Sequence, residues 1–259
     1  MSKNVLYVVC CYDEDKTYNV KPKNIFKEEH EFYDYEVRDS IINTTLPRLK
    51  IWCEYYNVEL RVIKKIPSEI QILCDKITAL YTKEYKDTNL IKGFNLKVQK
   101  AKYWFIKFYI LIEFCKSKYQ KFLYLDGDAF VNEYKDVFSL LDNGLYVKTK
   151  PATTTCPQYR YNKKYLDNTI DSFICGNIFG GTNHIKESMS KIVTYDILSN
   201  LLKEPKLFLN DEVILTYLFK EYNMLRELKD ETLGLKFSAG SERIYQYVLK
   251  SRKLWEILN

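Results

Sequence analysis

The feature that most constrains this chain is an apolar strand that ends in two aspartates. The residues from Lys121 to Leu125 predict a buried strand, which stops at Asp126 and Asp128. A buried carboxylate pair is costly unless a positive group lies between its members. A divalent cation carrying a diphosphate would meet that demand, and two carboxylates at one turn suit Mg²⁺ or Mn²⁺. Ligands of open α/β sheets bind at the carboxyl ends of strands, so we expect a metal and phosphate site here.

The Asp-x-Asp pattern is weak by itself, and the chain contains a second example at Asp13 and Asp15. The alternative for either pair is a solvated turn or a helix cap. The charge around Asp13 continues into Lys16, which favours a solvated loop. Apolar residues flank Asp126 and Asp128 on both sides, which favours a functional role for that pair.

Length and composition are those of a globular protein, and the mild positive charge suits a small anionic substrate. At 259 residues it can form one large α/β domain with a full core. The 46% hydrophobic and 29% charged residues are ordinary for such a domain, and the net charge of +6 suits an anionic substrate. No dense block of lysine and arginine is present, so we expect no nucleic-acid partner.

Cysteine usage and the N-terminus indicate a cytoplasmic protein. The seven cysteines are odd in number and form no CxxC pair, which is typical of reduced thiols. The chain passes from Met1 directly into a predicted strand, so we expect no signal peptide. The longest apolar run, 103–114, is too short to span a bilayer. We expect a soluble protein of the cytoplasm, or of the host cytoplasm if the chain is viral.

The first third of the chain predicts a strand, a helix and a second strand. The apolar run 4–12 predicts a buried parallel strand, and the alternation over 58–63 predicts the next one. Apolar residues at helical spacing lie between them, where Pro47 either kinks the helix or starts a new one near Thr45. The remaining predicted elements are a short helix over 70–80, a polar loop from Thr82 to Lys97, a buried helix over 101–114, a short helical piece over 137–141, a strand over 145–147, a loop over 149–168, one long helix over 183–202 and a helix from Asp211.

Residues 103–131 resemble the core of a GT-A fold, nucleotide-sugar-dependent glycosyltransferase. Those enzymes carry an aromatic-rich helix, an apolar strand ending in Asp-x-Asp, and a return to apolar residues, as Tyr124-Leu125-Asp126-Gly127-Asp128 does here. The resemblance implies one α/β, Rossmann-like domain with a central mixed, mostly parallel sheet flanked by helices. Residues 1–132 would form the nucleotide-binding half and 133–259 the half for the acceptor and donor sugar. Asp126 and Asp128 would hold Mn²⁺ or Mg²⁺ against the donor diphosphate.

Two further blocks resemble the blood-group A/B type galactosyl- and N-acetylgalactosaminyltransferases. A Phe-Gly-Gly segment lines the donor sugar in that family, which implies this role for Gly180 and Gly181. The family then has His-Asp-Glu at the start of a helix, where this chain has Asn210, Asp211 and Glu212. The resemblance implies that Glu212 lies beneath the anomeric carbon and that Asp211 contacts the sugar, so both are candidate catalytic residues. The alternatives are a tight turn between strand and helix for the glycines, and acids that complement a helix dipole for the second block.

The same resemblance implies roles for other residues. Cys10, Cys11 and Tyr12 would cradle the nucleotide base, or they are simply core. Lys107 would reach the donor nucleotide, or it snorkels to the surface. His184 could be a third metal ligand, but a histidine at the surface fits its position at a predicted helix start better. Basic residues of the tail, which could close over the diphosphate or belong to an ordinary amphipathic helix, are Lys236, Lys250, Arg252 and Lys253.

The predicted function is metal-dependent transfer of a sugar from a nucleotide sugar, expected to be a UDP-sugar, to a hydroxyl of a glycan or glycoprotein. One alternative is a nucleotide-sugar or glycan-binding module without turnover. Another is a phosphatase of the haloacid-dehalogenase type, which also ends a strand in Asp-x-Asp. That class has a small residue where this chain has Phe130, which argues against it.

Overall fold

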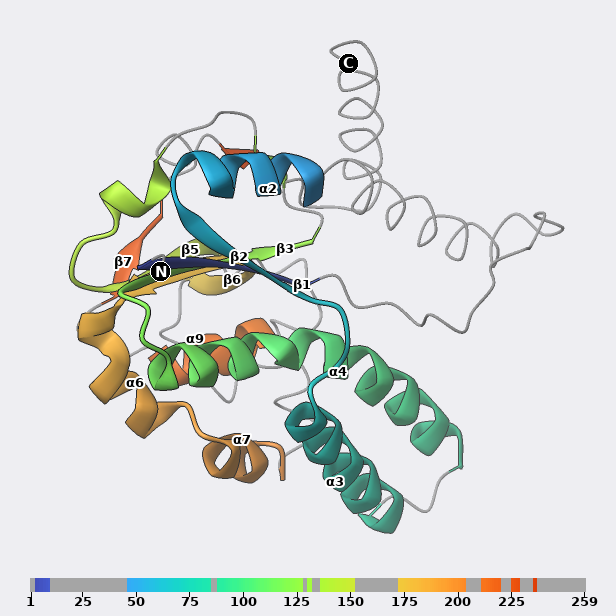
Figure 1. The fold of residues 1–259 in the computed structure, drawn as a ribbon. Coiled ribbons are helices and arrows are strands. Elements are labelled where there is room, and N and C mark those ends of the chain that lie inside the picture. The colour runs from blue at the N-terminus through green and yellow to red at the C-terminus, as the bar shows by residue number, and fades with distance from the viewer. Residues whose placement is uncertain are drawn as a thin grey trace, which may run out of the picture. The chain divides into compact units, whose positions relative to one another are not determined.

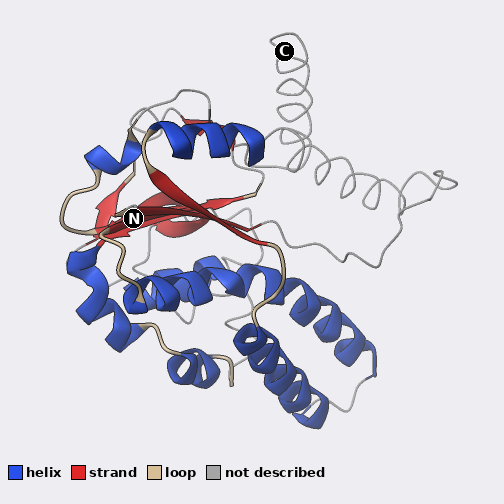
Figure 2. Cartoon of the chain, in the orientation of Figure 1, coloured by secondary structure: helices blue, strands red, loops and turns tan. Residues whose placement is uncertain are grey.

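The computed structural model describes residues 3–9, 46–84, 88–127, 130–131, 136–151, 172–203, 211–219, 225–228 and 235–236. These residues form an α/β protein with one six-stranded mixed sheet in the order β2-β1-β3-β6-β5-β7 (Figures 1 and 2). The predicted α/β class with a mixed, mostly parallel sheet is thereby confirmed. The six strands are β1 (Asn4–Val9), β2 (Val58–Ile63), β3 (Lys121–Asp126), β5 (Leu145–Pro151), β6 (Ser172–Thr182) and β7 (Leu225–Glu227).

The chain divides into two compact units. The first comprises residues 1–65, 125–137 and 229–259. In it, β1 pairs in parallel with β2, from Asn4 opposite Val58 to Val9 opposite Ile63. Its other described elements are helix α2 (Leu46–Tyr55) and the antiparallel pair β4 (Phe130–Val131) and β8 (Leu235–Lys236). The short 3-10 helix η2 (Val137–Leu140) contributes only its first residue to this unit.

Helix α2 begins where the sequence allowed a new helix. Pro47 stands in its first turn, where the missing N–H costs nothing. The helix packs on β2 through a buried face that contains Leu49, Trp52 and Cys53. The chain leaves the helix through Asn57, whose φ of 52° is the left-handed conformation that asparagine tolerates better than most residues.

The second unit comprises residues 66–124 and 138–228. Its strands are most of β3 together with β6, β5 and β7; β5 pairs antiparallel with β6 and parallel with β7. Figure 1 shows α4, α6 and α9 on one face of these strands. The described helices of the unit are α3 (Ser68–Glu84), α4 (Thr88–Lys116), α6 (Lys186–Ile192), α7 (Tyr195–Leu201) and α9 (Asp211–Phe219), with the 3-10 helix η3 (Asn183–Ile185) before α6.

The prediction of a polar loop from Thr82 to Lys97 is wrong. Helix α3 continues to Glu84, and α4 already begins at Thr88. Leu90, Phe94 and Val98 recur at helical spacing and lead into the apolar helix that the sequence did predict. The lysines and asparagines between them made this first half of α4 look like a loop.

The prediction of one long helix over 183–202 is also wrong, because the segment breaks into η3, α6 and α7. The main break lies at Val193 and Thr194, which both have extended backbone conformations. β-Branched residues tolerate that conformation well. The Thr194 side chain then accepts a hydrogen bond of 3.1 Å from the backbone N–H of Ile197, which caps the start of α7.

The described cysteines are thiols, and two of them lie in the core. Cys53, Cys74 and Cys115 are free thiols. Burial raises the pKa of Cys53 and of Cys74 to about 12, so both behave as core residues. Within the described parts of the chain, no helix has the length and apolarity that crossing a bilayer requires.

Candidate functional site

A buried ion pair joins the C-terminal half of α4 to the first residue of α9. The Lys107 Nζ donates to the Asp211 Oδ2 at 2.5 Å, across 104 residues of sequence. Both residues are only 5% exposed. Lys107 therefore does not snorkel to the surface, which was the structural alternative for it. Burying two charges costs desolvation free energy. Buried charged groups of this kind cluster at functional sites, so the pair marks a candidate site.

Next to this pair, β6 departs from regular pairing with β5. Val147 pairs with Phe179, and Thr149 pairs with Ile174, so residues 175–178 stand opposite Lys148 alone. An irregularity of this kind leaves backbone groups of the bulged strand without their ladder partners. One of them is used by α9, because the backbone N–H of Gly176 donates to the Glu212 Oε1 at 3.1 Å.

A third contact attaches α9 to β6 one turn further on. The Thr216 Oγ1 accepts a hydrogen bond of 2.9 Å from the Ile174 N–H and donates one of 2.7 Å to the Glu212 carbonyl. The first turn of α9 is thus held by an ion pair, by a carboxylate on the bulge and by a buried hydroxyl. Asp211 is buried, whereas Glu212 keeps part of its surface. Glu212 is therefore the acid of the two that is better placed to meet a ligand.

Gly176 makes this arrangement possible. A Cβ atom at Gly176 would overlap the Asp211 carboxylate and would lie 2.9 Å from the Lys107 Nζ. We expect Gly176→Ala to lower the free energy of unfolding by about 1–3 kcal/mol, as overpacking does, because the ion pair has to shift. Urea denaturation followed by circular dichroism measures this loss.

The matched control for Gly176→Ala is Ser190→Ala, because Ser190 is exposed on α6 and a change there should stay within about 0.5 kcal/mol. If Gly176→Ala is as stable as the unchanged protein, the close approach of Asp211 to β6 is wrong.

Asp126 is the last residue of β3, which runs one residue further than the predicted strand from Lys121 to Leu125, and it is partly buried. It belongs to the first unit, whereas Lys107, Asp211 and Glu212 belong to the second. The predicted site residues Cys10, Cys11, Tyr12 and Asp128 lie outside the described residues, as do Asp13, Asp15 and Asn210. Among the residues that are described, no group of three or more His, Cys, Asp or Glu side chains is arranged to hold a metal.

Gly180 and Gly181 lie inside β6, which continues to Thr182, and not in a turn between strand and helix. Both are buried. A Cβ atom at Gly180 would lie 2.8 Å from the Phe122 carbonyl oxygen, and one at Gly181 would lie 2.6 Å from the Ile185 Cδ1. The two glycines thus let β6 approach β3 and η3 closely. Their predicted contact with a donor sugar stays a prediction.

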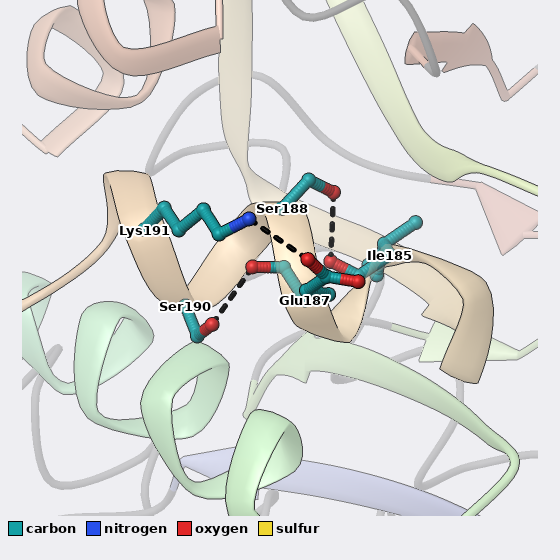
Figure 3. A network of polar contacts seen from close by, with 5 residues as sticks. All are labelled: Ile185, Glu187, Ser188, Ser190 and Lys191. Atoms are coloured by element: carbon teal, nitrogen blue, oxygen red, sulfur yellow. Dashed lines mark hydrogen bonds and ion pairs between the residues drawn. The ribbon is translucent and has the colours of Figure 1, made fainter.

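A second polar network, on α6, is of a different kind (Figure 3). The Lys191 Nζ donates to the Glu187 Oε1 at 2.8 Å, and this hydrogen bond lowers the pKa of Glu187. The Ser188 and Ser190 hydroxyls donate to the carbonyls of Ile185 and Glu187. Glu187, Ser190 and Lys191 are exposed, so this network is an ordinary helix surface. His184, just before α6, is exposed as expected for a surface histidine.

Two residues of the cluster around Asp211 were not predicted from the sequence. These residues are Gly176 and Thr216. A glycine that follows the apolar run Phe173-Ile174-Cys175 is a signal of a bulge in β6. The pairing of Thr216 with Ile174 leaves no mark in the sequence.

Comparison with known proteins gives distant structural likenesses. No protein-family model matches the chain, and no curated protein matches it. The apo form of mouse xyloside xylosyltransferase 1 is similar with a TM-score of 0.43 and 8% identity, over 88% of this chain and 86% of the other. A glycosyltransferase involved in the glycosylation of the major capsid of PBCV-1 is similar with a TM-score of 0.44 and 11% identity, over 93% of this chain and 99% of the other. At these scores and identities, neither likeness carries an argument about what this chain does.

Proposed function

We propose that this protein is a glycosyltransferase that moves a sugar from a nucleotide sugar, a UDP-sugar in the first instance, to a hydroxyl of a glycan or glycoprotein. The observation that carries the proposal is the end of β3, a buried strand that stops at the first aspartate of Asp-x-Asp. The resemblance of residues 103–131 to GT-A glycosyltransferases supports it. The acidic start of α9, attached to a bulge of β6, supports it further.

The residues at the end of β3 fit a divalent cation by their chemistry. Asp126 is a partly buried carboxylate at a strand end, and Asp128 follows it after one glycine. Carboxylate oxygens are the ligands that Mg²⁺ and Mn²⁺ prefer. Asp126 and Asp128 would hold the ion, which would supply charge stabilisation for the diphosphate leaving group.

The proposal gives the acids of α9 different roles. Glu212 keeps part of its surface and would stabilise the positive charge that develops at the anomeric carbon, or attack that carbon. Its carboxylate is oriented by the Gly176 N–H, so little reorganisation is needed when the sugar binds. Asp211 would support Glu212 from the core.

The first test is thermal stability against a panel of nucleoside diphosphates and nucleotide sugars, with and without Mn²⁺. A ligand that binds only the folded state at about a hundred times its Kd adds about 2.7 kcal/mol to the free energy of unfolding. We expect one nucleotide class to raise the melting temperature only when metal is present. Asp126→Ala together with Asp128→Ala should abolish the increase.

The chain supplies its own control for this test, because Asp13 and Asp15 form a second Asp-x-Asp. Asp13→Ala together with Asp15→Ala should leave the stabilisation unchanged. If no nucleotide changes the melting temperature, the proposed function is wrong. If a nucleotide sugar binds but is not consumed with any acceptor or water, the protein is a binding module that has no turnover.

A further inference from the structure

We propose that Lys107 is a positioning residue for Glu212 and acts through Asp211, without contacting the donor. This inference rests on the proposed function. The resemblance to glycosyltransferases implied that Lys107 reaches the donor nucleotide. The structure instead places its ammonium group on Asp211, with only 5% of the residue exposed.

The position of the ion pair gives Lys107 control over where α9 begins. Lys107 lies in the C-terminal half of a 29-residue helix, among residues that are themselves buried. Asp211 is the first residue of α9, and Glu212 is the next. An anchor at Asp211 therefore fixes the backbone of Glu212, because a single peptide unit joins the two residues.

We expect the other attachments of α9 to hold Glu212 less well once that anchor is lost. The Gly176 N–H meets the Glu212 carboxylate at 3.1 Å, and the Thr216 hydroxyl ties the helix to Ile174 one turn later. Without the ammonium group, the buried Asp211 carboxylate loses a compensating cation and lies beside a second acid. Movement of Asp211 toward water would carry Glu212 away from the bulge of β6.

Loss of the Lys107 ammonium group should affect turnover much more than binding of the nucleotide. A misplacement of about 1 Å from a change outside the reacting groups can reduce a rate by about 10²-fold. We expect Lys107→Met to lower kcat by about this factor while KM for the nucleotide sugar and Kd for the nucleoside diphosphate change by less than about threefold, as uniform binding is kept. In the double variant Lys107→Met with Asp211→Asn, the buried charge that lost its ammonium partner is removed, so kcat should recover at least about tenfold relative to Lys107→Met.

The experiment measures kcat, KM and the Kd of the nucleoside diphosphate with Mn²⁺ for the unchanged protein, both single variants and the double variant. Lys116→Met is the matched control, because Lys116 is an exposed lysine at the end of the same helix. A loss of nucleotide binding of about tenfold or more in Lys107→Met, or no recovery in the double variant, overturns the inference. If Lys107→Met does not fold, the double variant decides. A lysine that binds the donor is missing in the double variant too, so nucleotide binding would stay weak. A lysine that only positions Glu212 is no longer needed once the charge of Asp211 is removed, so binding and turnover would be kept.

A second measurement does not depend on the proposed function. Glu212→Gln weakens the contact with Gly176, so it should lower the urea midpoint of unfolding in the unchanged protein. In the background of Lys107→Met alone, the same change should lower the midpoint much less, since Glu212 is already less well held there. Equal shifts in both backgrounds overturn the positioning role, even if the protein transfers no sugar. A protein that shows the expected coupling but consumes no nucleotide sugar contradicts only the proposed function.

Discussion

Replacing Lys107 by methionine is expected to lower the free energy of unfolding by about 3–5 kcal/mol, which is the cost of removing one partner from a buried ion pair. Both partners are 5% exposed, so water cannot compensate the Asp211 carboxylate without a change in structure. Native domains have only about 5–15 kcal/mol of stability in total. The loss should appear as a large decrease in the urea midpoint, followed by circular dichroism.

The double variant Lys107→Met with Asp211→Asn distinguishes charge from packing. It removes both charges and keeps side chains of similar length and shape, so it should recover a large part of the loss. Lys116→Met, at the exposed end of α4, should stay within about 0.5 kcal/mol of the unchanged protein. If the double variant is as unstable as Lys107→Met alone, lost packing of the lysine stem explains the effect and the ion pair does not.

The elements that could be predicted from the sequence are those with a strong local pattern. The alternation over 58–63 gave the bounds of β2, and the apolar run before Asp126 gave β3 to within one residue. The two acids at 211 and 212 indicated the start of α9, since acids favour the first turn of a helix. In each case one property of neighbouring residues was enough.

The ion pair between Lys107 and Asp211 could not be predicted in this way. The two residues are 104 positions apart, and each had an adequate local explanation as a surface lysine or a helix-start acid. The bulge of β6 depends on how β5 pairs with it, which is a property of two strands. Buried polar contacts between distant elements are decided by tertiary packing, and local patterns carry little information about them.

The second large effect is expected at Phe122, in the aromatic cluster of the second unit. The Phe122 ring lies 4.2 Å from the Phe114 ring of α4 and 6.0 Å from the Phe179 ring of β6, measured between centroids. Phe179 in turn stacks on Tyr124 at 4.6 Å. Phe122 is fully buried, so Phe122→Ala should lower the free energy of unfolding by about 3–5 kcal/mol. Ile72→Ala, at an exposed apolar residue of α3, is the control and should cost far less.

The same cluster constrains Gly181, for which the family resemblance implied contact with a donor sugar. A Cβ atom at Gly181 would lie 3.1 Å from the Phe122 ring and 2.6 Å from the flexible end of Ile185. Gly181→Ala should therefore cost about 1–3 kcal/mol by overpacking in the unchanged protein. After Phe122→Ala the extra methyl group enters the space that the ring has left. The loss of stability in the double variant should therefore be smaller than the sum of the two single losses. Strictly additive losses would show that Gly181 is kept small by Ile185 and by the Gly144 carbonyl oxygen, which lies 3.1 Å from the same Cβ position, and not by Phe122.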